Sequence, residues 1–220
     1  MVTIVRLKTC NDVLRKRDAE LIGEALKRGG VAVFPTDTVY GLGGDPRRPD
    51  VVEKVLAIKK RQKRALPVLA SSNEVAAQVA KVNELSLLLM EKLWPGPVTL
   101  ILPCVDKTLA TLVGHGGKIG IRVPDCRVAR YLSEILGGLI VGTSANISRE
   151  VPPTSFEEVP EEVLERVEVA VDAGRTKYKK ASTVIEVLED KLVIRREGPV
   201  GVGRLEELLR GVRIEKAHRL

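Results

Sequence analysis

Hydroxyl-bearing side chains follow an apolar run near the start of the chain, and their types suggest ligand chemistry. The run Val31–Phe34 is typical of a buried strand, and it is followed by Thr36, Thr38 and Tyr40 and by glycines at positions 41, 43 and 44. Glycine lets the backbone approach a ligand closely, and loops at strand ends commonly carry ligand sites in α/β proteins. The segment therefore predicts a ligand-binding loop.

Cationic residues and further small polar residues accompany this loop. Ser144 and Asn146 follow the apolar run 139–141, Ser182 opens a predicted strand over 184–187, and five of the six residues 59–64 are basic. A basic run can also be a solvated helix end, where cations complement the helix dipole. Hydroxyls, backbone amides and cations together bind oxyanions, and such a site catalyses by positioning and by stabilising phosphate charge. The residues favour an anion- or nucleotide-binding protein.

The familiar catalytic and cofactor motifs are absent from the sequence. It contains no GxGxxG before a helix, no GxxxxGK[ST], no HExxH, no CxxC pair and no GxSxG. The only histidines are His115 and His218, which argues against zinc- or histidine-based catalysis. The three cysteines are widely separated, and we interpret them as reduced thiols.

Alternating helices and strands are expected to position these residues, which predicts an α/β fold. A cap at Asn11 or Asp12 should begin a helix that ends near residue 28, and residues 109–117 and the charged tail are expected to be irregular. Further helices are predicted near 49–58, 73–82, 84–93, 127–136 and 205–209. Strands are predicted near 31–34, 66–70, 98–102, 119–123, 139–141, 169–171, 184–187 and 192–194.

Length, charge and hydropathy limit the class of protein. The chain has 220 residues, of which 44% are hydrophobic, and we expect one domain over 1–220 with its core at about 12–210. The net charge of +7 favours anionic partners. No apolar run approaches the roughly 20 residues of a membrane span. The N-terminus shows no signal-peptide core, so a cytoplasmic location is expected.

Seven motifs occur in a fixed order: PTDTVYGLGGD, K-x-R after the second helix, WPGPVT, IRVPD, TSANIS, STVIEV and REG. In this order the sequence resembles the YrdC-like family of L-threonylcarbamoyladenylate synthases over about Leu21–Pro199. The resemblance implies a twisted mixed β-sheet with flanking helices that encloses a large, open, basic cavity. Longer members carry an additional C-terminal domain, so a single-domain member is expected.

The resemblance also implies a reaction. L-Threonine and bicarbonate form a carbamate, which attacks the α-phosphorus of ATP, brought with Mg²⁺, and gives threonylcarbamoyl-AMP and pyrophosphate. A threonylcarbamoyl-transferase complex would then use this product on tRNA. A carbamate oxygen is already anionic, so no general base is expected.

The resemblance implies roles for ten residues. Lys59 and Arg61 are expected to be catalytic and to bind the nucleotide together with Arg64, Ser144, Asn146, Ser182 and Arg196. Threonine and bicarbonate are expected to contact Thr36, Tyr40, Arg61 and Arg122. No protein side chain is expected to ligate the metal. Two departures from the family pattern are Leu69, where some longer members have histidine, and Arg149, which replaces the usual glycine after SANxS.

Two alternatives remain open at this point. A tRNA- or ribosome-associated RNA-binding factor without turnover would fit the net charge and the basic run 59–64, although only 3% of the residues are aromatic and few could stack on bases. Direct RNA binding could also accompany synthase activity. A carbamoyl-transfer domain of hydrogenase maturation proteins shares the implied fold. Residues 111–117 and 174–181 are candidate lids over the open cavity.

Overall fold

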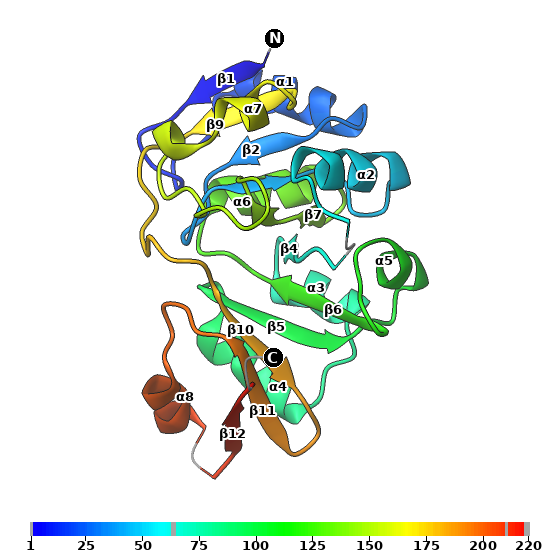
Figure 1. Ribbon diagram of the computed structural model, residues 1–220, viewed down its shortest axis with the longest axis vertical. Coiled ribbons are helices and arrows are strands. Elements are labelled where there is room, and N and C mark those ends of the chain that lie inside the picture. The colour runs from blue at the N-terminus through cyan, green and yellow to red at the C-terminus, as the bar shows by residue number, and fades with distance from the viewer. Residues whose placement is uncertain (1, 63–64, 210, 218–220) are drawn as a thin grey trace.

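The computed structural model describes residues 2–62, 65–209 and 211–217, and it contains two mixed β-sheets. The five-stranded sheet has the order β1 (Thr3–Arg6), β9 (Val169–Asp172), β2 (Ala32–Phe34), β3 (Gly41–Gly43) and β8 (Thr143–Ser144). The seven-stranded sheet has the order β12 (Arg213–Lys216), β11 (Lys191–Arg196), β10 (Thr183–Val187), β5 (Val98–Pro103), β6 (Lys118–Arg122), β4 (Val68–Ala70) and β7 (Leu139–Val141). Figure 1 shows the strands following one another along the long axis, from β1 at one end to β12 at the other.

The two sheets meet where β3 approaches β7. The Val141 amide donates to the Gly44 carbonyl over 2.9 Å. A Cβ atom on Gly43 would lie 1.7 Å from the Val141 carbonyl oxygen, a distance that no side chain could tolerate. Glycine at position 43 is therefore required for this close approach, which brings the loops after β2 and β7 to one place.

Helices flank both sheets, and several have clear sequence signals at their ends. Pro49 begins α2 (Pro49–Ile58), and the Ser72 hydroxyl caps α3 (Asn73–Val79) by accepting from the Val75 amide. Asn83 and Ser86 form a reciprocal capping pair at α4 (Glu84–Leu93). The other helices are α1 (Lys16–Lys27), α5 (Lys107–Leu112), α6 (Arg127–Ile135), α7 (Glu161–Leu164) and α8 (Val202–Leu208). The mixed sheets and flanking helices confirm the predicted α/β class.

Aliphatic side chains fill two contiguous cores. The larger core joins α2, α4 and the central strands of the seven-stranded sheet, with Leu100 and Ile121 fully buried. The smaller core lies between α1, α6 and β2, around Ile22 and Phe34. Trp94 packs in the larger core beside a cis Trp94–Pro95 bond, and its indole nitrogen donates to the Val98 carbonyl over 2.6 Å. Trp94 is thus a core residue beside the turn that leads into β5.

Three predictions about local structure are wrong. The first helix begins at Lys16, because the Asp12 carboxylate closes a turn by accepting from the Lys8 and Thr9 amides. Part of the expected loop 109–117 is α5, whose N-terminus is capped by the Asp106 carboxylate. The tail contributes β12, which pairs in parallel with β11. Within the described residues, no helix is long and apolar enough to cross a membrane.

Candidate functional site

A cavity of about 1230 Å³ lies between the loops that follow β2, α2 and β7 and one face of the seven-stranded sheet. We call residues 36–41, 59–62 and 142–149 the loop wall. The lining residues of β5, β6, β10 and β11, together with residues 181–182, form the sheet wall. Every predicted site residue that the structure describes lines this cavity: Thr36, Tyr40, Lys59, Arg61, Arg122, Ser144, Asn146, Ser182 and Arg196. Arg64, the tenth, lies outside the described residues.

The described lining of the cavity is strongly basic. It contains one carboxylate, that of Glu186, and eight cationic side chains: Lys59, Lys60, Arg61, Lys118, Arg122, Arg149, Arg195 and Arg196. So many cations around one cavity focus a positive potential on it. The expected large basic cavity is therefore present, and it suits a polyanionic ligand.

The first loop of the loop wall is folded around its own hydroxyl groups. The Thr36 hydroxyl donates to the Val39 carbonyl over 2.6 Å and accepts from the Thr38 amide over 3.1 Å. The Tyr40 hydroxyl donates to the Gly174 carbonyl over 2.8 Å and accepts from the Ala173 amide over 3.0 Å. Burial raises the pKa of Tyr40. These hydroxyls shape the loop that borders the cavity.

Lys59 joins the end of α2 to the loop after β7. Its ammonium donates to the carbonyl oxygens of Ser144 and Asn146 over 2.5 and 2.8 Å and to the Asn146 side-chain oxygen over 3.3 Å. Burial, and then the charge of Arg61, lower the pKa of Lys59 to about 8, against the opposing effect of Glu150. Lys59 thus positions the second loop and adds charge to the cavity wall, with its three donors directed at protein oxygens.

Arg122 forms a buried ion pair with a residue of the first loop. Its guanidinium donates to the Asp37 carboxylate, to the Thr38 hydroxyl over 2.8 Å and to the Gly96 carbonyl over 2.8 Å. The Arg122 and Asp37 side chains are 5% and 0% exposed. Burial lowers the pKa of Arg122, and the Asp37 charge opposes this effect. Two of its five N–H groups therefore hold the loop wall against the sheet wall, and a third bonds to the turn before β5.

Ser182 and Arg196 form a second polar cluster on the sheet wall. The Ser182 hydroxyl lies 2.8 Å from the Thr99 hydroxyl and accepts from the Arg196 guanidinium over 3.1 Å. Desolvation, and then the charge of Arg122, lower the pKa of Arg196. In the described residues Arg196 has no carboxylate partner. An uncompensated guanidinium next to two hydroxyls can bind an oxyanion.

The carboxylate of Glu186 is held by two cations. Lys118 donates to one of its oxygens over 2.5 Å, and Arg195 donates to the other. Sequence reasoning missed this group and Thr99, although a signal was present. Thr99 and Ile101 are two residues apart on β5, and Val184 and Glu186 are two residues apart on β10, the spacing of side chains that share one face of a sheet.

The segment 174–181, expected to be a mobile lid, is bonded to the first loop and to its neighbours. The Thr176 hydroxyl donates to the Thr38 carbonyl over 2.8 Å, and the Tyr178 amide donates to the Asp37 carbonyl over 2.9 Å. Lys177 forms an exposed ion pair with Asp125. The segment runs beside the loop wall, so it buttresses the first loop in this conformation.

A second, smaller cavity of about 600 Å³ lies between α1 and α6. Its lining includes Leu14, Gly23, Tyr131 and Ile135, and it contains none of the predicted site residues. The candidate chemistry is therefore concentrated in the basic cavity.

Comparisons with known proteins agree with this geometry. The model of the Sua5/YciO/YrdC family, described as "Telomere recombination", matches residues 24–198. A protein of Methanocaldococcus jannaschii is 32% identical over 206 residues, which cover 92% of this chain and 96% of that protein. The threonylcarbamoyl-AMP synthase of Bacillus subtilis is 32% identical over 218 residues, which cover 93% of this chain and 61% of that enzyme.

A solved structure extends the likeness to the fold. The crystal structure of Pyrococcus abyssi Sua5 complexed with L-threonine has a TM-score of 0.86 and 28% identity, and the match covers 98% of this chain and 62% of that one. The chain thus spans nearly the whole length of some relatives and about three fifths of others. On the extent of the family match and the identity to these relatives, the chain belongs to the Sua5/YciO/YrdC family.

Proposed function

We propose that this protein is a threonylcarbamoyl-AMP synthase, which uses ATP, L-threonine and bicarbonate to make threonylcarbamoyl-AMP, pyrophosphate and water. The observation that carries the proposal is the basic cavity, whose described lining contains eight cations and one already paired carboxylate, in a chain of this family. ATP brings about four negative charges, which such a cavity can neutralise. Relatives of the chain are named for this activity, and P. abyssi Sua5 has been solved with L-threonine.

Catalysis in this proposal depends on positioning and electrostatics. The carbamate oxygen attacks the α-phosphorus, the bond to the bridging oxygen of the β-phosphate breaks, and pyrophosphate leaves with the negative charge. Lys59, Arg61 and Arg196 supply positive charge around the triphosphate as charge moves toward the leaving group. The attacking oxygen is already anionic, so no side chain has to accept a proton.

Magnesium enters as part of the substrate, bound to the ATP phosphates. The Glu186 carboxylate is held by Lys118 and Arg195, so it is poorly suited to ligate a metal as well. Among the residues that the structure describes, no cluster of three or more histidine, cysteine, aspartate or glutamate side chains could hold a metal ion. We therefore assign the metal's coordination to phosphate oxygens and water.

The two groups of predicted residues would hold different substrates. We assign L-threonine and bicarbonate to the side of the cavity bordered by Thr36, Tyr40, Arg61 and Arg122. The nucleotide would contact Ser144, Asn146, Ser182 and Arg196, with Lys59, Arg61 and Arg64 near its phosphates. The Arg122 charge that lowers the pKa of Arg196 indicates that the two sides adjoin, as the transfer of one group to the other requires.

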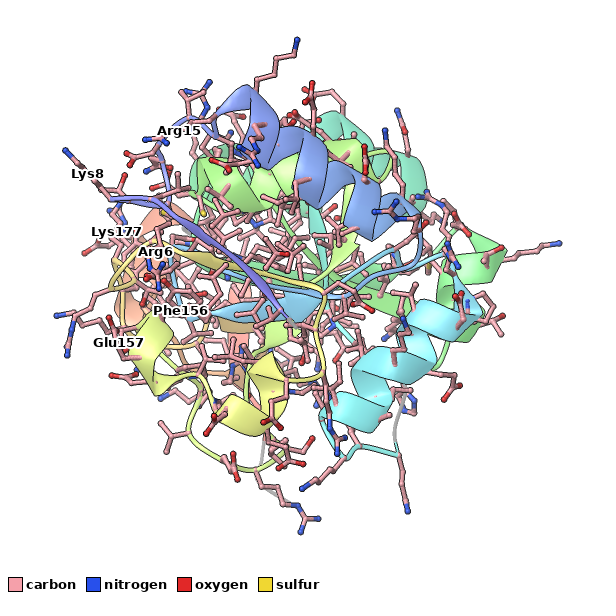
Figure 2. All side chains as sticks on the ribbon, turned by 90° about the horizontal axis from the view of Figure 1, so that it is seen from above. Arg6, Lys8, Arg15, Phe156, Glu157 and Lys177 are labelled. Carbon is pink, nitrogen blue, oxygen red and sulfur yellow. The ribbon has the colours of Figure 1, made fainter. Side chains whose placement is uncertain are left out.

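The product needs an acceptor, and we propose a threonylcarbamoyl-transferase complex that acts on tRNA in the cytoplasm. Direct RNA binding by this chain is a further part of the proposal. Arg6, Lys8, Arg15 and Lys177 lie on the same side of the molecule when it is seen from above (Figure 2), where they could contact phosphates. Binding there should weaken steeply with salt.

Pyrophosphate release tests the proposed function. The assay supplies Mg·ATP with and without L-threonine and bicarbonate, replaces L-threonine with L-serine as a control, and identifies the product by mass. We expect release that requires threonine and bicarbonate together and prefers threonine over serine. Threonine-independent hydrolysis would refute the proposal, and salt-sensitive RNA binding without any turnover would refute it in favour of the RNA-binding alternative.

A further inference from the structure

Two described residues of the loop wall have a positive φ, which is costly for a residue other than glycine: Lys60 at 51°, whose ammonium pairs with Glu162, and Arg149 at 80°. Residues 147–150 form a β-turn, closed by a hydrogen bond of 3.1 Å from the Glu150 amide to the Ile147 carbonyl. Arg149 is the third residue of this turn, and its φ is 80°. A turn with positive φ at the third position normally has glycine there, because a side chain is strained in this region. Such an outlier points to a function for the side chain.

The surrounding hydrogen bonds hold the turn in this conformation. The Asn146 side-chain amide donates to the Ile147 carbonyl over 3.0 Å and to the Glu150 carbonyl over 2.7 Å. The Ser148 amide donates to the Lys59 carbonyl over 3.0 Å. These bonds fix the turn against the end of α2, so the position of the Arg149 Cα atom is determined by the fold.

The Arg149 guanidinium has no protein partner in the described part of the chain. It lines the basic cavity and is exposed, and it forms no hydrogen bond or salt bridge there. Within residues 2–62 and 65–209, Arg61 on the neighbouring segment also has no carboxylate partner, and the Lys59 ammonium donates only to carbonyl oxygens. Three cations without carboxylate partners therefore lie on adjoining segments of one wall, an arrangement that favours a ligand with several negative charges.

We propose that Arg149 binds the β- and γ-phosphates of ATP, the part of the nucleotide that leaves as pyrophosphate. This inference rests on the proposed function for the identity of the nucleotide. Adenosine is uncharged, so the cation cluster suits the triphosphate. Lys59 is buried within the wall, whereas Arg149 is exposed at its edge, which fits the outermost phosphates. Arg149 would then neutralise the leaving group.

The test compares two substitutions of Arg149 with a matched control. Arg149→Gly removes the cation and relieves the turn, and Arg149→Lys keeps a charge without the planar fork. Lys179→Gly is the control, because Lys179 is also an exposed cation with positive φ (49°) but does not line the cavity. Isothermal titration calorimetry measures Kd for ATP, tripolyphosphate and AMP in the presence of Mg²⁺, and thermal unfolding measures stability.

We expect Arg149→Gly to weaken binding of ATP and of tripolyphosphate about tenfold, at the lower end of the range for a charged hydrogen bond. AMP affinity should change less than twofold, and the unfolding temperature should stay the same or rise. Arg149→Lys should fall between the wild type and Arg149→Gly. Unchanged affinity for tripolyphosphate in Arg149→Gly, or an equal loss in Lys179→Gly, would overturn the inference.

This experiment separates the inference from the proposed function, because binding is measured without turnover. If the tenfold effect is found but pyrophosphate release does not depend on threonine and bicarbonate, the proposed synthase function fails while Arg149 remains a phosphate-binding residue. If release depends on both substrates but tripolyphosphate affinity is unchanged in Arg149→Gly, the assignment of Arg149 fails alone.

Discussion

The two walls of the cavity use their polar side chains in different ways. On the loop wall, Lys59, Tyr40 and Asn146 direct their hydrogen bonds mainly to backbone groups, at distances of 2.5 to 3.3 Å. On the sheet wall, Ser182 and Glu186 bond to other side chains that themselves line the cavity. The polar residues of the loop wall thus fix the shape of the backbone, and those of the sheet wall can exchange a neighbouring side chain for a ligand as their hydrogen-bond partner.

The two walls therefore contain two kinds of site residue, which act on a ligand in different ways. A side chain whose donors are directed at backbone oxygens acts on a ligand through its charge and through the loop that it holds. A side chain bonded to a neighbouring hydroxyl can exchange that partner for a ligand at small cost, because both partners border the cavity. Substitutions in the loop wall should therefore lower mainly the free energy of unfolding, and substitutions in the sheet wall should lower mainly the affinity for substrate.

The largest effect is expected where the two walls are joined, at the buried pair of Arg122 and Asp37. Arg122→Ala would leave the Asp37 carboxylate buried without its cation, and one of its oxygens already has no hydrogen-bond partner within the described residues. We expect the free energy of unfolding to fall by about 3–5 kcal/mol, measured by urea denaturation. The double variant Arg122→Met, Asp37→Leu should recover part of this loss.

A second comparison sets this pair against the one on the sheet wall. The Glu186 side chain is 9% exposed, but its partners Lys118 and Arg195 are 37% and 48% exposed, so water reaches both cations of this pair. Glu186→Gln should therefore cost about 1–2 kcal/mol, less than Arg122→Ala, because both cations stay in contact with water and the amide oxygen still accepts a hydrogen bond. Equal losses for Arg122→Ala and Glu186→Gln would show that the two walls do not differ in the way described.

Lys59 provides the next largest effect. Lys59→Met removes a buried charge and three hydrogen bonds to the second loop, and we expect kcat/KM to fall about 10- to 150-fold in the pyrophosphate assay. Lys54→Met is the matched control, because Lys54 lies on α2 and pairs with Glu168 away from the cavity. Near-normal turnover in Lys59→Met would contradict the assigned role.

The lowered pKa of Lys59 predicts that stability and ATP affinity change in opposite directions with pH. Its folded-state pKa of about 8 lies below the ordinary value of 10.5. Between these values the unfolded chain binds a proton that the folded chain does not, so the contribution of Lys59 to the free energy of unfolding rises with pH. ATP affinity should change in the opposite direction and fall as pH rises through about 8, because the cavity loses a positive charge. Lys59→Met should abolish both trends.

Much of the site could be predicted from local sequence. The apolar runs that end in Thr36 and Ser144 place these residues at strand ends, and Ser182 precedes a third such run. Glycine at position 43 is explained by the close approach of Val141, which the sequence could not identify as its neighbour. The pattern of apolar residues and the types of turn residue are local properties of the sequence. They predicted the strands that carry the site but not which strands lie next to one another.

The direction of each polar bond could not be predicted, because it depends on residues far apart in the chain. Lys59 contacts the carbonyl of Ser144, 85 residues away, and Arg122 contacts Asp37, also 85 residues away. The short strands β1, β3 and β8 were missed, since two to four residues form a strand only when a partner is present. By contrast, the Asp106 cap of α5 was a local signal that was overlooked.

Substitution of Tyr40 can show whether its hydroxyl only holds the loop in shape or also binds a ligand. Tyr40→Phe leaves the Ala173 amide and the Gly174 carbonyl without their partner, so the free energy of unfolding should fall by roughly 1–2 kcal/mol. The KM for threonine should change less than twofold if the hydroxyl only shapes the loop. Tyr131→Phe is the control, because its hydroxyl forms no hydrogen bond in the described residues. A large rise in the threonine KM with unchanged stability would reverse this interpretation.

Ser182 is expected to give the smallest effect. In contrast to Tyr40, its substitution should change substrate affinity more than stability. Its hydroxyl lies between Thr99 and Arg196 at the cavity surface, where water can replace it in Ser182→Ala. Stability should therefore change little, while the KM for ATP rises about fivefold through the loss of roughly 1 kcal/mol and the KM for threonine stays within twofold. If the threonine KM rises more than the ATP KM, the nucleotide and threonine sides of the cavity are exchanged, and the sheet wall holds the amino acid. That result would also move the attacking carbamate next to Arg196, so the two KM values together decide which wall receives which substrate.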